Sequence, residues 1–282
     1  MSVPTRDHRA TLGDLLRRVR QGGRLAMLAL YDATFAHLAE EAGVDAVLVG
    51  DSLAQTVQGR ESTLGVELDA ILYHLACVAR GCRRPFLLAD LPFGSFESSP
   101  AAAFAAASRL LAAGAQMVKI EGGAPWVVET VRFLVERHVP VCGHLGLTPQ
   151  AILELGGYRV QGRAPEEARR LVAAARDLVA AGIRMLVLEC VPDDLAAHLT
   201  RSLEGVAVIG IGAGPATHGQ VLVAYDALGL TPPPRPRFVR DFLEGVGDAR
   251  LALGRFVRAV AEGSFPTVGE SYGPSGLDDL GA

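Results

Sequence analysis

Ionisable side chains stand at the ends of five successive apolar runs in this chain of 282 residues. Each run is short enough to be a buried strand, and the polar residues come where the run stops. They are Asp51 with Ser52, Asp90, Lys119 with Glu121, His144, and Glu189 with Cys190. Because a single charge is costly to bury, a series of them in equivalent places favours one shared site.

The residue types in this series indicate metal-assisted proton removal. Asp51 and Asp90, at neighbouring strand ends, are the usual protein contribution to a Mg²⁺ site, which keeps positions for water and substrate. Lys119 is the only lysine in the chain, and its ammonium can hold an anionic substrate. Glu189 has no evident partner and is a candidate general base. Together they predict deprotonation beside a carbonyl, with the metal bridging a 2-oxo acid and stabilising the enolate.

Each of these residues also has a structural interpretation. An Asp after a strand often caps the next helix, and a His in a glycine-rich turn is usually a local hydrogen-bonding group. Lys119 and Glu121 could form an internal ion pair, and Cys142 and Cys190 could be small core residues. Five consecutive strand ends that carry ionisable residues are harder to explain this way, so the set as a whole favours a site.

Eight apolar runs of strand length recur along the chain, and amphipathic stretches of helical length separate most of them. The runs are 25–30, 46–49, 85–89, 117–120, 140–142, 185–188, 206–211 and 221–225. They are apolar on both faces, as parallel strands covered by helices are. Helix ends are readable, as where Ser99 and Pro100 begin a helix and Gly114 ends it. Eight such units predict an α/β fold, a (β/α)8 TIM-type barrel, whose strand ends meet at one mouth.

A doubly wound open sheet is the competing arrangement, but no G-x-G-x-x-G motif follows the first run. The link 214–220 is too short for a full helix. We expect one catalytic domain over residues 1–265, with extra C-terminal helices, and a mobile tail over 266–282. The glycine-containing segment 154–163 is either a lid or a plain surface loop. The glycines within 210–214 are a weak signal for a phosphate cradle, because Pro215 removes a donor.

Composition and charge argue against several other classes. Half of the residues are hydrophobic, which argues against a disordered chain. The 31 acidic residues outnumber the 27 basic ones, so the chain is not basic enough to favour binding to nucleic acid. The first twenty residues carry charges where a secretory signal is apolar. Glycines break the uncharged run 205–225, so we expect no membrane span. Four cysteines without C-x-x-C spacing fit a reducing cytoplasm.

Long sequence strings make the chain resemble one family. From about Leu12 to Phe265 it carries YDATFA, VLVGDSLAQTVQG, LLADLPFGS, MVKIEGG, VPVCGHLGLTPQ, GGYRVQGR and LVLECVP in order. These strings are similar to those of the ketopantoate hydroxymethyltransferases, also called 3-methyl-2-oxobutanoate hydroxymethyltransferases, of pantothenate synthesis. The resemblance implies a Mg²⁺-dependent barrel enzyme that transfers the one-carbon unit of 5,10-methylenetetrahydrofolate to 3-methyl-2-oxobutanoate, which forms 2-dehydropantoate. It also implies a cytoplasmic homodecamer.

The same resemblance implies roles for individual residues. In VGDS, Asp51 matches a metal ligand, and Asp51 and Ser52 match substrate contacts. In LLADLP, Asp90 resembles the second metal ligand and also meets substrate. In VKIEGG, Lys119 matches the substrate-binding lysine, and Glu121 matches the acidic residue associated with the metal.

Two further residues and one alternative complete this comparison. Glu189 falls where the family has its proton acceptor, and His144 lies at the mouth as an auxiliary residue without an assigned role. After Phe265 the sequence departs from the family's usual ending. This departure affects what the resemblance implies about contacts of the C-terminus and leaves the implied chemistry unchanged. The alternative is a Mg²⁺-dependent lyase or mutase of the phosphoenolpyruvate mutase or isocitrate lyase type. Those enzymes resemble one another in a KKCGH motif, whereas this chain has VPVCGHLG without paired lysines.

Overall fold

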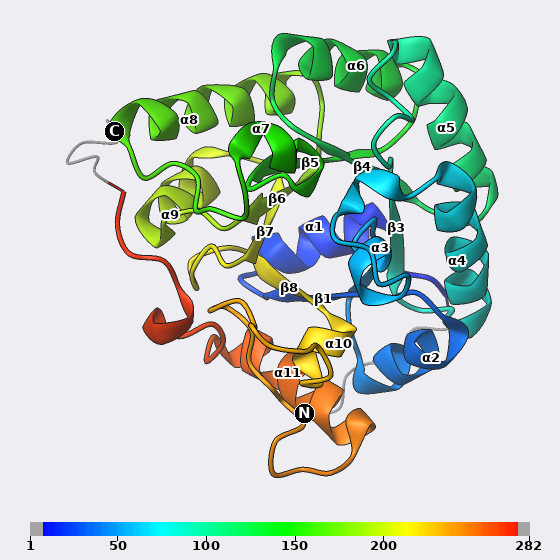
Figure 1. Ribbon diagram of the computed structural model, residues 1–282, viewed down its shortest axis with the longest axis vertical. Helices are drawn as coiled ribbons and strands as arrows, with labels where there is room; N and C mark the ends of the chain where they lie inside the picture. The colour runs from blue at the N-terminus through cyan, green and yellow to red at the C-terminus, as the bar shows by residue number, and fades with distance from the viewer. Residues whose placement is uncertain (1–7, 276–282) are drawn as a thin grey trace.

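The strands of this protein form a closed barrel. The computed structural model describes residues 8–275. Eight parallel strands pair in chain order, and the first pairs with the last. They are β1 (Leu25–Ala29), β2 (Ala46–Val49), β3 (Phe86–Asp90), β4 (Met117–Glu121), β5 (Val141–Gly146), β6 (Met185–Glu189), β7 (Ala207–Ile211) and β8 (Gly219–Val223). The predicted barrel is confirmed, and each strand lies within a few residues of its apolar run (Figure 1).

Helices surround the barrel and follow most of its strands (Figure 1). They are α1 (Leu12–Arg20), α2 (Ala33–Ala42), α3 (Leu53–Thr56), η1 (Thr63–Gly65), α4 (Leu68–Gly81), α5 (Pro100–Ala112), α6 (Pro125–Glu136), η2 (Pro149–Ala151), α7 (Ile152–Leu155), α8 (Pro165–Ala180), α9 (Asp193–Ser202), α10 (Ala224–Ala227), α11 (Ala249–Glu262) and η3 (Val268–Glu270). The connection 212–218 between β7 and β8 contains no helix, as its length predicted.

Alternation along the strands produces two apolar layers. One set of side chains packs between barrel and helices, and the other fills the interior of the barrel. The interior set includes Leu88 on β3 and Met117 on β4, and Leu15 of α1 closes the amino-terminal end. Because side chains alternate across a strand, the residues two positions further along, Asp90 and Lys119, also point inward.

Local signals set the ends of α5 as predicted. Ser99 Oγ accepts a hydrogen bond from the N–H of Ala102 at 3.1 Å, and Pro100 occupies the first turn. Proline is suited to this position because the first-turn N–H groups have no partner within the helix. The helix ends at Ala112, shortly before Gly114, whose φ of 114° a residue with a side chain rarely adopts.

The C-terminal segment packs beyond the domain end expected at residue 265. The Arg240 guanidinium contacts both carboxylate oxygens of Glu270 at 2.6 Å. Further along, the Ser275 hydroxyl donates a hydrogen bond to Asp194 in α9 at 2.7 Å. These polar contacts, together with the packing of Tyr272 against the apolar core, hold residues 266–275, and no apolar periodicity in the sequence marks this segment. Residues 276–282 lie outside the described residues, so the mobility expected over 266–282 stays a prediction.

The remaining sequence expectations concern membrane spans and thiols. No helix within residues 8–275 is both long and apolar enough to cross a membrane. All four cysteines are free thiols. Cys142 is buried in the barrel interior among apolar side chains, which supports its interpretation as a small core residue.

Candidate active site

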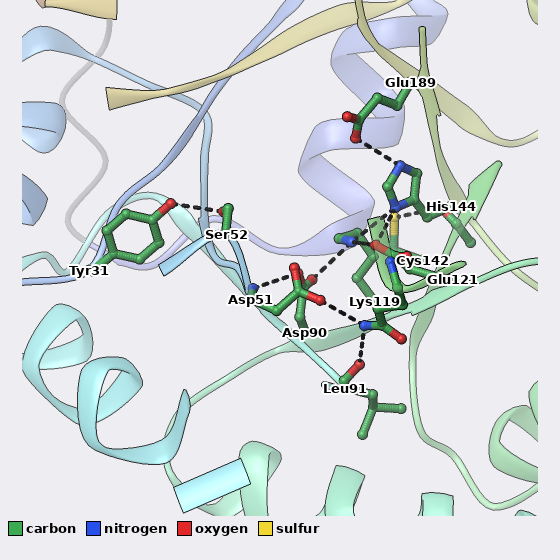
Figure 2. Close-up of polar contacts among 12 residues, drawn as sticks. Tyr31, Asp51, Ser52, Asp90, Leu91, Lys119, Glu121, Cys142, His144 and Glu189 are labelled. Carbon is green, nitrogen blue, oxygen red and sulfur yellow. Dashed lines mark hydrogen bonds and ion pairs between the residues drawn. The ribbon is translucent and has the colours of Figure 1, made fainter. Parts of the chain in front are cut away.

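The polar residues expected to share a site meet at the carboxyl end of the barrel. Strand register places Asp90 beside Lys119 and Glu121 beside His144, and Glu189 ends β6. All seven candidate residues line one cavity of about 640 Å³. They are Asp51, Ser52, Asp90, Lys119, Glu121, His144 and Glu189. Figure 2 shows Asp51, Asp90, Lys119, Glu121 and His144 gathered together, with Glu189 beyond the imidazole.

Asp51 and Asp90 are held against each other by the backbone of β2 and β3. The N–H of Asp51 donates to Asp90 Oδ2 at 3.0 Å. Glycine at position 50 suits this approach, because a Cβ there would make tight contacts, 3.2 Å from Asp90 Oδ2 and 3.0 Å from Ser52 Oγ. Among the described residues, no side-chain hydrogen bond caps α3, whose capping position is Ser52, and the Asp51 side chain accepts from Gln150. The interpretation of Asp51 as a helix cap is therefore not supported.

The cluster has more negative than positive groups. Burial raises the pKa of Asp51 to about 6, with Glu121 adding to the effect, and raises that of Asp90 to about 8 against the attraction of Lys119. The Lys119 ammonium is 3.3 Å from Asp90 Oδ1 and 3.5 Å from Glu121 Oε1. Burial alone would lower the pKa of Lys119, but the three carboxylates raise it, so this side chain stays charged at neutral pH.

Asp51 and Asp90 suit a hard cation. Asp90 Oδ1 is buried and accepts no hydrogen bond from the described residues, although Lys119 Nζ is near it. Mg²⁺ in proteins typically takes one or two carboxylates and completes its shell with water and substrate oxygens. Within residues 8–275, no group of three His, Cys, Asp or Glu side chains is placed to hold a metal. Two adjacent carboxylates with one unpartnered oxygen fit a Mg²⁺ ion that keeps several positions for water and substrate.

Glu121 is engaged by the protein through both carboxylate oxygens. Oε2 accepts the N–H of Gln150 at 2.9 Å, and Oε1 lies 3.0 Å from His144 Nδ1 and 3.5 Å from Lys119 Nζ. Burial raises the pKa of Glu121, and Lys119 opposes that effect. In this arrangement Glu121 acts on the site by its charge and hydrogen bonds, and the direct metal ligation that the resemblance implies stays a prediction.

His144 separates Glu189 from the other carboxylates (Figure 2). Its Nε2 lies 3.2 Å from Glu189 Oε2, and its Nδ1 lies 3.1 Å from Lys119 Nζ. Burial and the charge of Lys119 lower the pKa of His144 to about 4, so the imidazole is neutral at pH 7 and carries one N–H. Nδ1 lies between Lys119 Nζ, which can only donate, and Glu121 Oε1 at 3.0 Å, which accepts when ionised. The tautomer with its proton on Nε2 suits Lys119 and Glu189, whereas the tautomer with its proton on Nδ1 suits Glu121.

A constrained backbone places Glu189 at the mouth. The next residue, Cys190, has φ 47°, a left-handed conformation that residues other than glycine rarely adopt. On the neighbouring strand β5, a Cβ on Gly146 would lie only 2.2 Å from the Glu189 carbonyl oxygen, so glycine is required there. The same carbonyl oxygen accepts a hydrogen bond from the N–H of Leu147 at 2.8 Å. The Glu189 side chain is 17% exposed, against 2% for Asp90, so its carboxylate is the one more open to the cavity.

Two residues behind this cluster were missed by the sequence analysis. The buried Tyr31 hydroxyl lies 2.8 Å from Ser52 Oγ (Figure 2). The side-chain Nε2 of Gln150 donates to Asp51 Oδ2 at 2.8 Å. Neither residue is charged at neutral pH, so a search for ionisable side chains at strand ends passes over them. Their positions in the strings YDATFA and LTPQ were the only signal available.

The outer wall of the cavity is formed by segments whose roles the sequence did not decide. Tyr158 of the loop 154–163 accepts a hydrogen bond from Gln55 Nε2 at 2.9 Å, so this loop reaches across to α3. Tyr158 and Tyr272, the second from the C-terminal segment, both line the cavity. The contact with Gln55 favours the lid interpretation of the loop over that of a plain surface connection.

The glycines of 210–214 are explained by packing. A Cβ on Gly212 would lie 2.7 Å from the Phe238 ring, and one on Gly214 would lie 2.5 Å from Asp193 Cβ. Both glycines also have positive φ values. These contacts favour a structural role over a phosphate cradle.

A parallel barrel with buried carboxylates, a lysine and a histidine gathered at the ends of its strands is the arrangement of a TIM-barrel enzyme. Residues 9–268 match the family model described as ketopantoate hydroxymethyltransferase. The 3-methyl-2-oxobutanoate hydroxymethyltransferase of Azoarcus sp. (strain BH72) is 52% identical over 272 residues, which cover 96% of this chain and 100% of that protein. The enzyme of the same name from Thiobacillus denitrificans is 51% identical over 93% of this chain and 99% of its own. The chain belongs to the ketopantoate hydroxymethyltransferase family, as its resemblance predicted.

Solved structures with lower sequence identity share the fold. A phosphonopyruvate hydrolase in complex with oxalate and Mg²⁺ superposes with a TM-score of 0.58 at 17% identity and covers 93% of both chains. A 2,3-dimethylmalate lyase of the PEP mutase/isocitrate lyase superfamily has a TM-score of 0.57 at 17% identity, covering 77% of this chain and 82% of its own. At these identities the likeness extends to the barrel alone, and the family match decides against the lyase or mutase alternative.

Proposed function

We propose that this protein transfers the one-carbon unit of 5,10-methylenetetrahydrofolate to 3-methyl-2-oxobutanoate in pantothenate biosynthesis. Water supplies the new hydroxyl, and the products are 2-dehydropantoate and tetrahydrofolate. The observation that carries the proposal is the pairing of Asp51 with Asp90 in a cavity that also holds one lysine and one more open carboxylate, in a member of this family. The cavity of about 640 Å³ has a size usual for small-molecule sites.

Asp51 and Asp90 are the residues that would hold Mg²⁺. When bound there, the ion would offset their charge and draw electrons from the 2-oxo group of the substrate. Lys119 lies at the same strand ends and can contact the substrate carboxylate with a compact ammonium. Ser52, whose hydroxyl is oriented by Tyr31, can contact the substrate from the β2 side.

Glu189 is the residue that we propose takes the C3 proton of 3-methyl-2-oxobutanoate. Its carboxylate faces the cavity, and His144 contacts it from the protein side at 3.2 Å. A neutral imidazole that donates to this carboxylate orients it without protonating it. Water cleaves both C–N bonds of the methylene bridge, which releases tetrahydrofolate with its two N–H groups restored and leaves the one-carbon unit at the oxidation level of formaldehyde. The C3 enolate adds to this carbon, and the proton held by Glu189 passes to the new alkoxide oxygen to give the hydroxyl.

One reaction tests this proposal. The purified protein is incubated with 3-methyl-2-oxobutanoate, 5,10-methylenetetrahydrofolate and Mg²⁺, and 2-dehydropantoate is sought by mass spectrometry. We expect product only when all three are present. Turnover of phosphonopyruvate or 2,3-dimethylmalate without 2-dehydropantoate formation would instead support a lyase or mutase.

We also propose that the protein assembles into a homo-oligomer, a decamer, in the cytoplasm. Large apolar side chains remain exposed on the single chain, with Tyr73 on α4 68% exposed and Trp126 on α6 45% exposed. Contacts between copies would cover such side chains. Light scattering should report a large closed assembly, and a monomer at micromolar concentration would contradict this proposal.

A further inference from the structure

Gln150 connects the carboxyl ends of three strands. It lies in η2, and its side-chain Nε2 donates to Asp51 Oδ2 at 2.8 Å and to the carbonyl oxygen of Leu91 at 3.0 Å. Its backbone N–H donates to Glu121 Oε2 at 2.9 Å. Asp51 follows β2, Leu91 follows β3, and Glu121 is the last residue of β4. Gln150 is buried and does not line the cavity, so it acts on the site from behind.

The hydrogen-bond partners fix the orientation of the Gln150 amide. Both neighbours of Nε2 are acceptors, so the NH₂ group must face them, and both of its N–H bonds are used. The amide oxygen, Oε1, is buried and has no hydrogen-bond partner among the described residues. A buried amide that leaves its own acceptor unmatched is unfavourable by itself. Its presence here is explained if the two donors serve Asp51 and Leu91.

We propose that Gln150 is a positioning residue for the metal. By holding Asp51 Oδ2, its amide stops rotation of that carboxylate and leaves the other oxygen, Oδ1, for the cation. Without the amide, Asp51 Oδ2 would lose the hydrogen bond that fixes the orientation of this carboxylate. This inference rests on the metal site of the proposed function.

The test replaces the amide and leaves the backbone contact with Glu121 in place. In Q150M a side chain of similar length makes no hydrogen bond, and in Q150A the smaller residue leaves room for water to reach Asp51 and Leu91. The matched control is Q220M, because buried Gln220 also donates twice from Nε2, to the Gly214 carbonyl oxygen at 3.0 Å and Thr217 Oγ1 at 2.8 Å. Gln220 makes no hydrogen bond with the carboxylate cluster.

Metal binding is measured without substrates, on the full chain after chelator treatment. Mn²⁺ is the probe, its free fraction is read by electron paramagnetic resonance, and circular dichroism gives the folded fraction and the thermal midpoint. Loss of an orienting partner of a metal ligand typically weakens metal affinity by about 10–100-fold. We expect that increase in the Mn²⁺ Kd for Q150M and Q150A. For Q220M we expect a lowered thermal midpoint and a Kd within about twofold of wild type.

Three results would overturn the inference. Folded Q150M and Q150A with wild-type Mn²⁺ affinity would show that Gln150 does not position the metal ligand, while leaving the proposed function intact. A Q220M Kd raised as much as that of Q150M would show a general loss of stability. Wild-type protein that binds no Mn²⁺ would overturn the proposed metal site, and this inference with it.

Discussion

Replacing Glu189 by Gln removes the proposed base with little structural change. Gln keeps the shape of the side chain and can still accept a hydrogen bond from His144, the contact at 3.2 Å. Because one hydrogen bond contributes about 0.5–1.5 kcal/mol and this one is retained, stability should change by less than that. A general base typically contributes about 100-fold to 10,000-fold in rate, so turnover should fall by that factor. Metal binding should stay unchanged, because no hydrogen bond or ion pair joins Glu189 to Asp51 or Asp90 among the described residues.

The chemical step can be followed without folate. In D₂O with Mg²⁺, wild-type protein should exchange the C3 proton of 3-methyl-2-oxobutanoate, which removes the C3–H signal from the proton NMR spectrum and collapses the methyl doublet to a singlet. Glu189→Gln should slow this exchange by the same factor as turnover. Turnover and exchange should agree, because both need the same proton to leave C3.

A control and a contrary result make the test decisive. Glu204→Gln removes an exposed carboxylate just before β7, at the opposite end of the barrel, and should exchange at the wild-type rate. If Glu189→Gln also exchanges at that rate while folded, the assignment of the base is wrong. His144, the neighbouring imidazole, would then be the next candidate.

Three further predictions concern the metal, the lysine and the C-terminal segment. Asp90→Asn removes a charge from the cation site, so Mn²⁺ affinity by paramagnetic resonance should fall at least about 10-fold and turnover should nearly vanish; unchanged affinity would exclude Asp90 as a ligand. Lys119→Arg keeps the charge but puts a larger planar group in a buried site, so it should fold by circular dichroism and lose about 100-fold in kcat/KM, and wild-type kinetics would make the lone lysine incidental. Burial raises the pKa of Glu270, but hydrogen bonds from Arg240 and Thr267 outweigh burial and lower it below 4.5. Because the pKa of Glu270 is lower in the folded than in the unfolded protein, ionised Glu270 stabilises the fold above pH 4.5. This stabilisation is lost as the pH falls through the folded-state pKa. The thermal midpoint of wild type should therefore drop more steeply in acid than that of Glu270→Gln, and equal slopes would contradict the ion pair.

The sequence alone predicted the barrel and the residues that meet at the carboxyl ends of its strands. Eight apolar runs separated by helical stretches predicted eight strands, and side-chain alternation then directs Lys119 inward two positions after Met117. Closure of parallel strands in chain order brings all their carboxyl ends together. For that reason ionisable residues at five successive strand ends were enough to predict the cluster before any contact was known.

Only the tertiary structure decided which groups in the cluster touch. Asp51 receives its hydrogen bond from Gln150, 99 residues away, and both oxygens of Glu121 are engaged by other residues of the protein. Tyr272, which follows the domain end expected at residue 265, lines the cavity wall. Local patterns encode periodicity and burial, whereas a hydrogen bond depends on separations of about 3 Å between atoms on different loops. Those separations are set by strand register and loop paths, which exist only once the barrel has closed.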